Sequence, residues 1–254
     1  MRLNLNIARE IKIAIALVLL FVLISFSESQ NKDVVCKHII VKLENTNENH
    51  FLDEKDIIHL LSKENEALIG ASLSKISLRE LERRLSADKT IRNSEIFADL
   101  KGNLAVKVEL RRPIARILNN EGPDAYITED GAIMPVSDKF TSRVILISGA
   151  YTRQLLKQEN LNKEAEGKQL MELLKYINRD KFWKAQIAQL DINRQFDVTM
   201  FPQVSKQTVM FGVPENIEEK FTKLRVFYKE ILPASGWNKY EKVNLKYLNQ
   251  IVAE

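Results

Sequence analysis

The sequence predicts an α+β protein: an N-terminal transmembrane helix, a small domain with the element order βααββ, and a mixed β-sheet domain flanked by helices. Three observations carry this prediction: an apolar run near the N-terminus, two helical patterns lying between alternating stretches before residue 113, and many short alternating stretches after it. We expect a cytoplasmic N-terminus at 1–10, the transmembrane helix at 11–27, a linker at 28–35, and domains at 36–112 and 113–254.

The composition is that of an ordered protein. Of 254 residues, 45% are hydrophobic and 28% are charged, which argues against disorder. The net charge of +4 is spread without a Lys/Arg block, so nothing indicates nucleic-acid binding. The single cysteine, Cys36, excludes an internal disulfide and a cysteine-based zinc site. We expect Cys36 to be a semi-buried strand residue.

The apolar run at residues 13–24 is the candidate membrane anchor. With Ile11 and Phe26 it reaches about 16 residues, or roughly 24 Å of helix, which is short of a hydrocarbon core of about 30 Å. Lys12 can extend its stem and place its ammonium at the interface. The length is therefore borderline for a spanning helix.

Flanking charges give the expected orientation. Arg2, Arg9 and Lys12 precede the run, and Glu28 and Asp33 follow it. The positive-inside rule places the N-terminus in the cytoplasm and the rest of the chain outside. A cleaved signal peptide is the alternative, because residues 25–27 (Ser-Phe-Ser) hold small residues two apart after a short apolar stretch.

The strands of the first domain are indicated by alternation. Residues 39–43 alternate apolar and polar side chains, and residues 96–100 and 104–110 do so on either side of Gly102-Asn103. Glycine tolerates the positive φ of a hairpin turn, so we expect the turn at this pair. Pro113 then ends the ladder.

Two helices are expected between those strands. Asp53 can cap the first, whose buried face carries Ile57, Ile58 and Leu61. Residues 77–80 (Ser-Leu-Arg-Glu) form a capping-box pattern, in which the side chains of Ser77 and Glu80 satisfy backbone N–H groups of the first turn. A leucine stripe at positions 78, 81 and 85 follows.

The second domain combines strands with two longer helices. A hairpin is expected at residues 126–135, around Asp130-Gly131, and further strands at 144–147, 188–192, 196–200, 208–211 and 243–247. Helical patterns run from about 163 to 178 and from Pro214 to Pro233. We expect the large aromatic side chains to fill the core, namely Phe182, Trp183, Phe201 and Trp237.

Several segments, in order along the chain, resemble the FtsQ/DivIB family of bacterial cell-division proteins. Residues 70–82 are similar to its Gly-x-x-Leu-x-x-Ile-(Asp/Ser)-x-x-x-Leu-(Glu) segment, and residues 91–113 to the closing hairpin of its POTRA domain (polypeptide-transport-associated). Residues 126–131 and 243–247 are similar to the opening hairpin and near-terminal strand of its β domain. The chain departs from the family at Glu44-Asn45, where a glycine is usual, and at Asn244 and Lys246, which replace Asp and Arg.

The resemblance implies a non-catalytic scaffold in cell division. Family members bind the paired membrane proteins FtsB and FtsL and help to regulate septal peptidoglycan synthesis, so the septal synthase complex is a further expected partner. The resemblance also implies a single-pass protein of the cytoplasmic (inner) membrane at the division septum, with its bulk extracytoplasmic or periplasmic. We expect no cofactor, metal, nucleic acid or small-molecule substrate.

The partner-binding residues implied by the resemblance are Val243, Leu245, Lys246 and Tyr247. In the family, a partner adds a strand at the end of the β domain, where an edge strand offers unpaired N–H and C=O groups. By residue match, Lys246 offers a cation and Tyr247 a flat anchor. The alternative is an ordinary amphipathic strand that packs on its own sheet.

Enzymatic functions find little support in the sequence. The Gly-x-Ser-x-Gly motif is absent, since residues 70–74 fail at the last position. His50 and His59 flank several carboxylates, but we interpret this loose cluster as solvated surface charge. Two alternatives to a division scaffold stay open: an envelope-assembly protein that carries a POTRA domain, and a secreted enzyme with a cleaved signal peptide.

Overall fold

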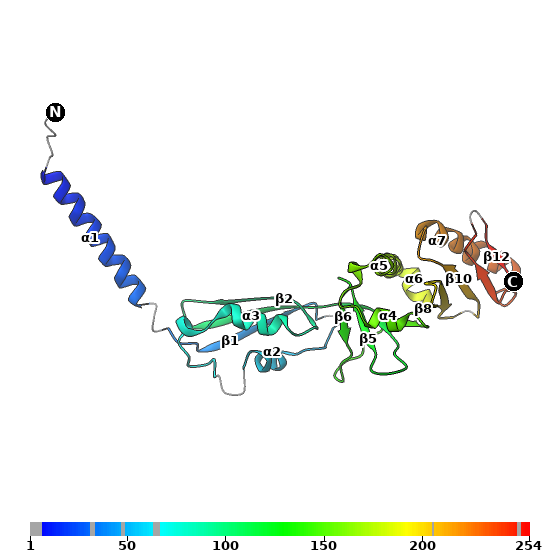
Figure 1. Ribbon diagram of the computed structural model, residues 1–254, viewed down its shortest axis with the longest axis horizontal. Helices are drawn as coiled ribbons and strands as arrows, with labels where there is room; N and C mark the ends of the chain where they lie inside the picture. Colours follow the sequence, from blue (N-terminus) through cyan, green and yellow to red (C-terminus); the bar gives the residue numbers. More distant parts are fainter. Residues whose placement is uncertain (1–6, 31–33, 47–48, 63–66, 205, 248–249) are drawn as a thin grey trace, which may run out of the picture. The chain divides into compact units, whose positions relative to one another are not determined.

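The computed structural model describes residues 7–30, 34–46, 49–62, 67–204, 206–247 and 250–254 (Figure 1). The chain forms two compact units. Unit 1 contains residues up to Glu44 and Leu52–Glu109, and unit 2 contains Asn45–Phe51 and Leu110–Glu254. The chain is α+β, as predicted, with a three-stranded sheet in unit 1 and a nine-stranded mixed sheet in unit 2.

Helix α1 spans Ile7–Gln30. It is longer than the expected 11–27 segment and takes in residues 28–30 of the expected linker, because Glu28 and Gln30 continue a helix although they are polar. Its described apolar side chains are exposed: Ile15, Leu17, Val18, Leu19, Leu20, Phe21, Val22, Leu23 and Ile24. Among the described residues, no helix is both long and apolar enough to cross a membrane.

Unit 1 has the predicted βααββ order. Its elements are β1 (His38–Glu44), α2 (Glu54–Leu61), the 3-10 turn η2 (Leu73–Lys75), α3 (Leu78–Ser86), β2 (Ile91–Ala98) and β3 (Asn103–Leu110). The sheet order is β1-β3-β2, with β1 parallel to β3. The buried residues of β3 alternate as predicted, and they form the core of unit 1 with Ile57, Leu61, Leu81 and Leu85. Cys36 is fully buried, with 1% of its surface exposed.

The hairpin of unit 1 turns earlier than predicted. Strand β2 ends at Ala98, and Asp99 accepts hydrogen bonds from the backbone N–H groups of Lys101 (2.9 Å) and Asn103 (2.8 Å). The hydrogen bonds from Asn103 lower the pKa of the Asp99 carboxyl. Leu100 therefore lies exposed in the turn and not on the inner face of a strand. Gly102 has φ +94°, and a Cβ there would lie 2.5 Å from the carbonyl oxygen of Val35.

The capping box lies on α2 and not, as predicted, on α3. Asp53 accepts from the backbone N–H of Asp56 (3.0 Å), and the Asp56 carboxylate accepts from that of Asp53 (2.9 Å). Ser77 stands at the N-cap of α3, but its side chain makes no capping hydrogen bond. Glu80 instead accepts a hydrogen bond from Arg83 (2.9 Å), because the ion pair along the helix surface competes for its carboxylate.

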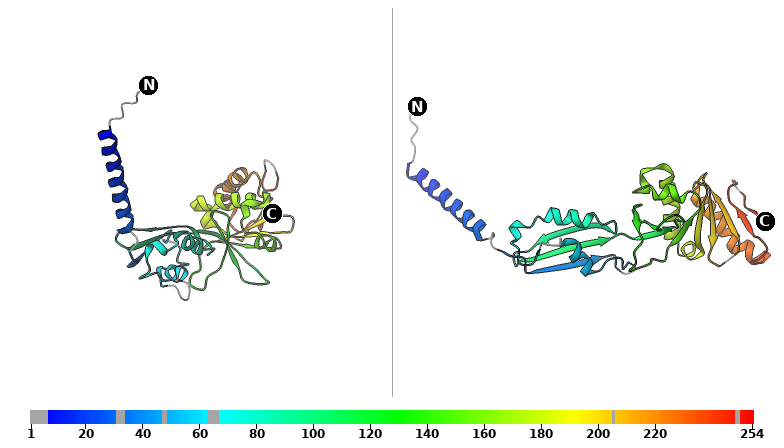
Figure 2. Two further views of the ribbon diagram at one scale, coloured as in Figure 1. Left: turned by 60° about the vertical axis from the view of Figure 1, so that its left-hand side comes forward. Right: turned by 60° about the horizontal axis from the view of Figure 1, so that its bottom comes forward.

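Unit 2 is built on one mixed sheet with the order β12-β11-β10-β9-β8-β7-β4-β5-β6. The pairs β4–β7, β7–β8 and β10–β11 are parallel, and the other pairs are antiparallel. The strands can be followed by colour in Figure 2. Their bounds are β4 (Pro113–Ile117), β5 (Ala125–Thr128), β6 (Ile133–Pro135), β7 (Ile145–Ser148), β8 (Ile187–Ile192), β9 (Val198–Pro202), β10 (Thr208–Gly212), β11 (Lys242–Asn244) and β12 (Val252–Ala253).

Helices pack on this sheet and complete the core. They are α4 (Thr152–Leu156), the 3-10 turn η3 (Leu161–Lys163), α5 (Ala165–Arg179), α6 (Lys181–Gln186), α7 (Ile217–Val226), the π-helical turn η4 (Phe227–Ile231) and α8 (Leu232–Ser235). Trp183 is fully buried beside Phe221, as predicted for a core aromatic residue. The same prediction was wrong for Trp237, which is 54% exposed. Trp237 lies in the loop after α8 and not on a face that packs against the sheet.

Residues 45–51 follow β1 in sequence but belong to unit 2. Phe51 packs edge-on against Tyr126 and Phe140, with ring centroids 5.5 Å and 5.1 Å away. Asn45 donates to the carbonyl of Leu110 (3.2 Å). His50 packs edge-on against Phe140 in unit 2, whereas His59 is exposed in the last turn of α2 in unit 1. The two histidines considered as metal ligands thus belong to different units.

The two N-caps of unit 1 give a matched pair of substitutions. We expect Asp53→Ala to lower the free energy of unfolding by about 1 kcal/mol, because it frees the capped N–H groups of α2. Ser77→Ala should leave it nearly unchanged, since Ser77 makes no capping bond. Urea unfolding and amide exchange in α2 would measure both, and equal losses in the two variants would contradict the assignment of the cap.

Candidate partner-binding site

The expected partner-binding strand is shorter than predicted, and it is not at the edge of the described sheet. Strand β11 ends at Asn244 instead of continuing to Tyr247, and it pairs with β10 on one side and β12 on the other. Val243 faces Ala253, and Asn244 faces Val252. The strand at this end of the sheet is therefore β12, which the sequence analysis did not identify (Figure 1).

Val243 and Leu245 are fully buried, each with 0% exposure. Both belong to the hydrophobic core of unit 2, and the backbone N–H of Leu245 donates to the carbonyl of Met210 (3.0 Å). Their side chains therefore stabilise the sheet and have no free surface to offer to another molecule. The side chains of these two residues are therefore those of an ordinary amphipathic strand that packs on its own sheet.

Lys246 is fixed in place by an ion pair. Its Nζ lies 2.6 Å from Oδ2 of Asp197, which precedes β9, and the Lys246 side chain is 37% exposed. Gly212 at the end of β10 has φ +76°, and a Cβ there would lie 3.0 Å from Cγ of Lys246. The glycine therefore leaves room for the aliphatic stem of Lys246 to cross the end of β10.

Tyr247 is half exposed, and a helix holds its backbone. Its exposure is 50%, and its carbonyl oxygen accepts a hydrogen bond from Nζ of Lys223 on α7 (3.0 Å). The same ammonium donates to Glu219 one turn earlier (3.0 Å). The Lys223 side chain is only 16% exposed, so this bridge is better shielded from solvent than an ordinary surface pair. It leaves the aromatic ring of Tyr247 available for contact.

A pocket of about 360 Å³ lies beside these residues. Lys220 is its most buried cation: Nζ donates to the carbonyl of Val213 (2.8 Å) and lies 4.6 Å from the ring centroid of Phe211. Burial lowers the pKa of Lys220. The described lining residues are Asp197, Gly212, Val213, Glu215, Asn216, Glu219, Lys220, Lys223, Leu245, Lys246 and Tyr247.

The arrangement is suited to holding another chain. The pocket brings together the half-exposed Tyr247 and the ion pairs of Lys223 and Lys246. These residues follow β11, which pairs with the end strand β12. Tyrosine rings are common anchors at interfaces because they bury a large area at low entropic cost. Strand β12 carries backbone groups that a partner strand could pair with.

Two family models match the chain and together cover most of it. The model described as "FtsQ/DivIB, C-terminal related" matches residues 112–254, and a "POTRA-like domain" model matches residues 34–109. The chain belongs to the FtsQ/DivIB family. The resemblance seen in the sequence is therefore confirmed, and it indicates a scaffold role in cell division. No curated protein matches the chain.

Several residues of this candidate site were missed from sequence. Lys223 and Asp197 lie 24 and 49 positions from their partners Tyr247 and Lys246, and no local pattern links them. Strand β12 is only two residues long, too short for an alternation to be recognised. The one available signal was the i, i+4 spacing of Glu219 and Lys223, which is too common on helices to mark a site.

Leu245 is fully buried and Tyr247 is half exposed, so substitutions at these two residues should differ in their effect on stability. We expect Leu245→Ala to lower the free energy of unfolding by about 2–5 kcal/mol, as for other fully buried leucines. Tyr247→Ala should cost less than about 1 kcal/mol, because half of the side chain is exposed and the Lys223 hydrogen bond is to its backbone. Urea unfolding followed by near-UV circular dichroism would compare them, and similar losses would contradict this division.

Proposed function

We propose that this FtsQ/DivIB chain is a non-catalytic scaffold at the division septum that captures other membrane-anchored division proteins at the β12 end of unit 2. The observation that carries the proposal is that Tyr247 is half exposed while the Lys223 bridge holds its backbone, in the segment between β11 and the end strand β12. A partner strand would pair with β12 and pack a side chain on Tyr247. The FtsQ/DivIB and POTRA families are generally non-catalytic, which supports a binding role.

The proposed partners are division proteins of the FtsB and FtsL type, with the septal synthase complex as a further partner. Lys246 would meet an acidic residue of the partner, although its charge is shared with Asp197. Because a partner carboxylate would have to compete with Asp197, we expect Lys246 to contribute mainly to specificity and association rate, and Tyr247 to affinity. Val243 and Leu245 would act only by holding the strand in place.

We also propose that α1 anchors the chain as a single pass of the inner membrane. Its 24 residues would extend about 36 Å, and its described apolar side chains from Ile15 to Ile24 are exposed. Basic residues before the run favour an N-terminus in the cytoplasm, with units 1 and 2 outside, by the positive-inside rule. The size of the mature chain, measured by mass spectrometry, tests this: loss of the N-terminal residues would favour a cleaved signal peptide.

Depletion of the chain in its source bacterium tests the division role. We expect long filaments with several separated nucleoids and without septa, because growth continues when division stops. Imaging of cell length and DNA would show this, with a strain complemented by the intact gene as control. Normal septation with a defective envelope would contradict the proposal and favour a role in envelope assembly.

A substitution at Tyr247 tests the site itself. Tyr247→Glu should weaken capture of the FtsB/FtsL-type proteins of the same bacterium by about thirtyfold, the scale of an interface hot spot of about 2 kcal/mol. Tyr247→Phe keeps the ring and should bind nearly as well as the unsubstituted chain. Copurification and binding titration would measure both, with thermal unfolding as the folding control. Unchanged capture by Tyr247→Glu would refute the site.

A further inference from the structure

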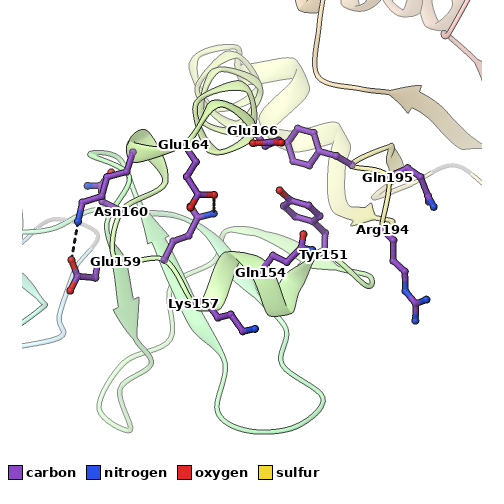
Figure 3. Close-up of a pocket in the computed structure, with 12 residues that line it drawn as sticks. Tyr151, Gln154, Lys157, Glu159, Asn160, Glu164, Glu166, Arg194 and Gln195 are labelled. Carbon is purple, nitrogen blue, oxygen red and sulfur yellow. Dashed lines mark hydrogen bonds and ion pairs between the residues drawn. The ribbon is translucent and has the colours of Figure 1, made fainter.

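A second pocket, of about 770 Å³, lies in unit 2 apart from the partner site and shares no described lining residue with it (Figure 3). Helix α4, η3, the start of α5 and the turn between β8 and β9 form it. Its described lining residues are Tyr151, Gln154, Lys157, Gln158, Glu159, Asn160, Lys163, Glu164, Glu166, Arg194, Gln195 and Phe196. None of them has a role in the proposed scaffold function.

Tyr151 is the central residue of this pocket. It is 92% buried. Its hydroxyl oxygen is open to the pocket, and it forms no hydrogen bond with a described residue. In Figure 3 the hydroxyl points toward the carboxylates of Glu164 and Glu166. Burial raises the pKa of Tyr151, and the charges of Glu166 and Glu164 raise it further, so the phenol stays neutral at physiological pH.

The turn after β8 holds an aromatic ring against Tyr151. The ring centroid of Phe196 lies 4.9 Å from that of Tyr151, and Phe196 is nearly buried. Its φ of +64° lies in the left-handed region, which a bulky residue rarely adopts and which costs about 1 kcal/mol or more. The pocket therefore presents two packed aromatic rings beside carboxylates.

Two hydrogen-bond acceptors at the pocket, Gln158 Oε1 and the Glu166 carboxylate, have no donor among the described residues. Gln158 Nε2 donates to Glu164 Oε2 (2.7 Å), but Gln158 Oε1 is buried without a partner in the described part of the chain. Glu166 has no ion pair or hydrogen bond to any described side chain. The nearby cations do not fill this gap: Lys163 pairs with Glu159 (2.9 Å), and Lys157 and Arg194 project away from Tyr151 in Figure 3.

We propose that this pocket binds an alkylammonium group, such as the side chain of a lysine. An ammonium carries three N–H donors and no acceptor, which matches Glu164, Gln158 Oε1 and the Tyr151 hydroxyl. Aromatic rings attract cations, and the carboxylates repel anions. The acidic residues at the start of α5 could serve only to complement the dipole of that helix. That role would not explain why the Tyr151 hydroxyl and the Gln158 oxygen have no partner among the described residues.

Fluorine NMR on the full chain in detergent micelles tests the proposal. The chain would carry 3-fluorotyrosine, and the Tyr151→Phe variant would assign the Tyr151 resonance among the six tyrosines. Nα-acetyl-lysine amide at millimolar concentrations should shift that resonance in a saturable way, whereas Nα-acetyl-norleucine amide, which lacks the charge, should not. No saturable shift, or equal shifts from both compounds, would overturn the proposal.

Substitutions at the carboxylates test the contacts. The double variant Glu164→Gln, Glu166→Gln should weaken binding of the lysine derivative by about tenfold, equivalent to about 1.4 kcal/mol. Glu159→Gln is the matched control, because that carboxylate is already paired with Lys163. If the double variant unfolds, Glu166→Gln alone replaces it, since Glu166 is exposed and unpaired among the described residues. Equal binding by the carboxylate variant and the control would overturn the proposal.

The source of the ammonium is distinguished with two further ligands. An acetylated Ala-Lys-Ala amide that binds about tenfold tighter (about 1.4 kcal/mol) than the lysine derivative would indicate a protein segment, and equal affinity would indicate a free amine. Both results support the proposal. If Nα-acetyl-arginine amide binds more tightly than the lysine derivative, the pocket prefers a guanidinium to an ammonium group. That result would overturn the proposal.

Discussion

The parallel pairing of β10 and β11 is the constraint on which the end of unit 2 depends. Two parallel neighbours cannot be joined by a tight turn, so the chain must cross over between them. Residues 213–241 make this crossover and carry α7, η4 and α8, whose buried residues Phe221, Leu224 and Phe227 pack against the sheet. The crossover also brings Lys223 to the segment after β11, where its ammonium donates a hydrogen bond to the carbonyl of Tyr247. Lys220 of the same helix donates instead to the carbonyl of Val213.

Two pockets of unit 2, beside Tyr247 and beside Tyr151, differ in how their charges are paired. Beside Tyr247, Lys246 and Lys223 are already paired with Asp197 and Glu219. Long-range attraction of the proposed partner would therefore contribute little, and its recognition would depend on shape and backbone pairing. Beside Tyr151, the buried oxygen of Gln158 has no donor among the described residues, and the proposed ammonium would supply one. The first arrangement suits a large protein partner, and the second suits a single functional group.

Much of the fold could be predicted from sequence, because it depends on local periodicity. The alternation of β3 and the stripe of α3 gave the correct elements, and the ordered motifs gave the correct family. The details that failed depend on competition between neighbours. The hairpin turns early because the Asp99 carboxylate accepts hydrogen bonds from backbone N–H groups of the turn. Glu80 does not cap α3 because its carboxylate is bound to Arg83. The local sequence is compatible with either position of the turn and with either partner of Glu80, and the choice depends on the packed structure.

The candidate site was less predictable than the fold. Its four expected residues lie within residues 243–247, but two of them are core residues, and the contacts of the other two come from α7 and from the turn before β9. Pairings of this kind depend on the order of strands in the sheet, which no single segment encodes. The short strand β12 has the same origin, because Val252 and Ala253 form a strand only by pairing with β11.

The assignment of residues 45–51 to unit 2 has a consequence for inheritance. The chain passes from unit 1 to unit 2 after Glu44, returns before Leu52, and passes again after Glu109. A single recombination event near residue 110 would therefore separate Phe51 from Tyr126, its packing neighbour in the core of unit 2. The two units can be exchanged between genes only with loss of part of that core, so selection should retain them as a pair rather than shuffle them as independent modules.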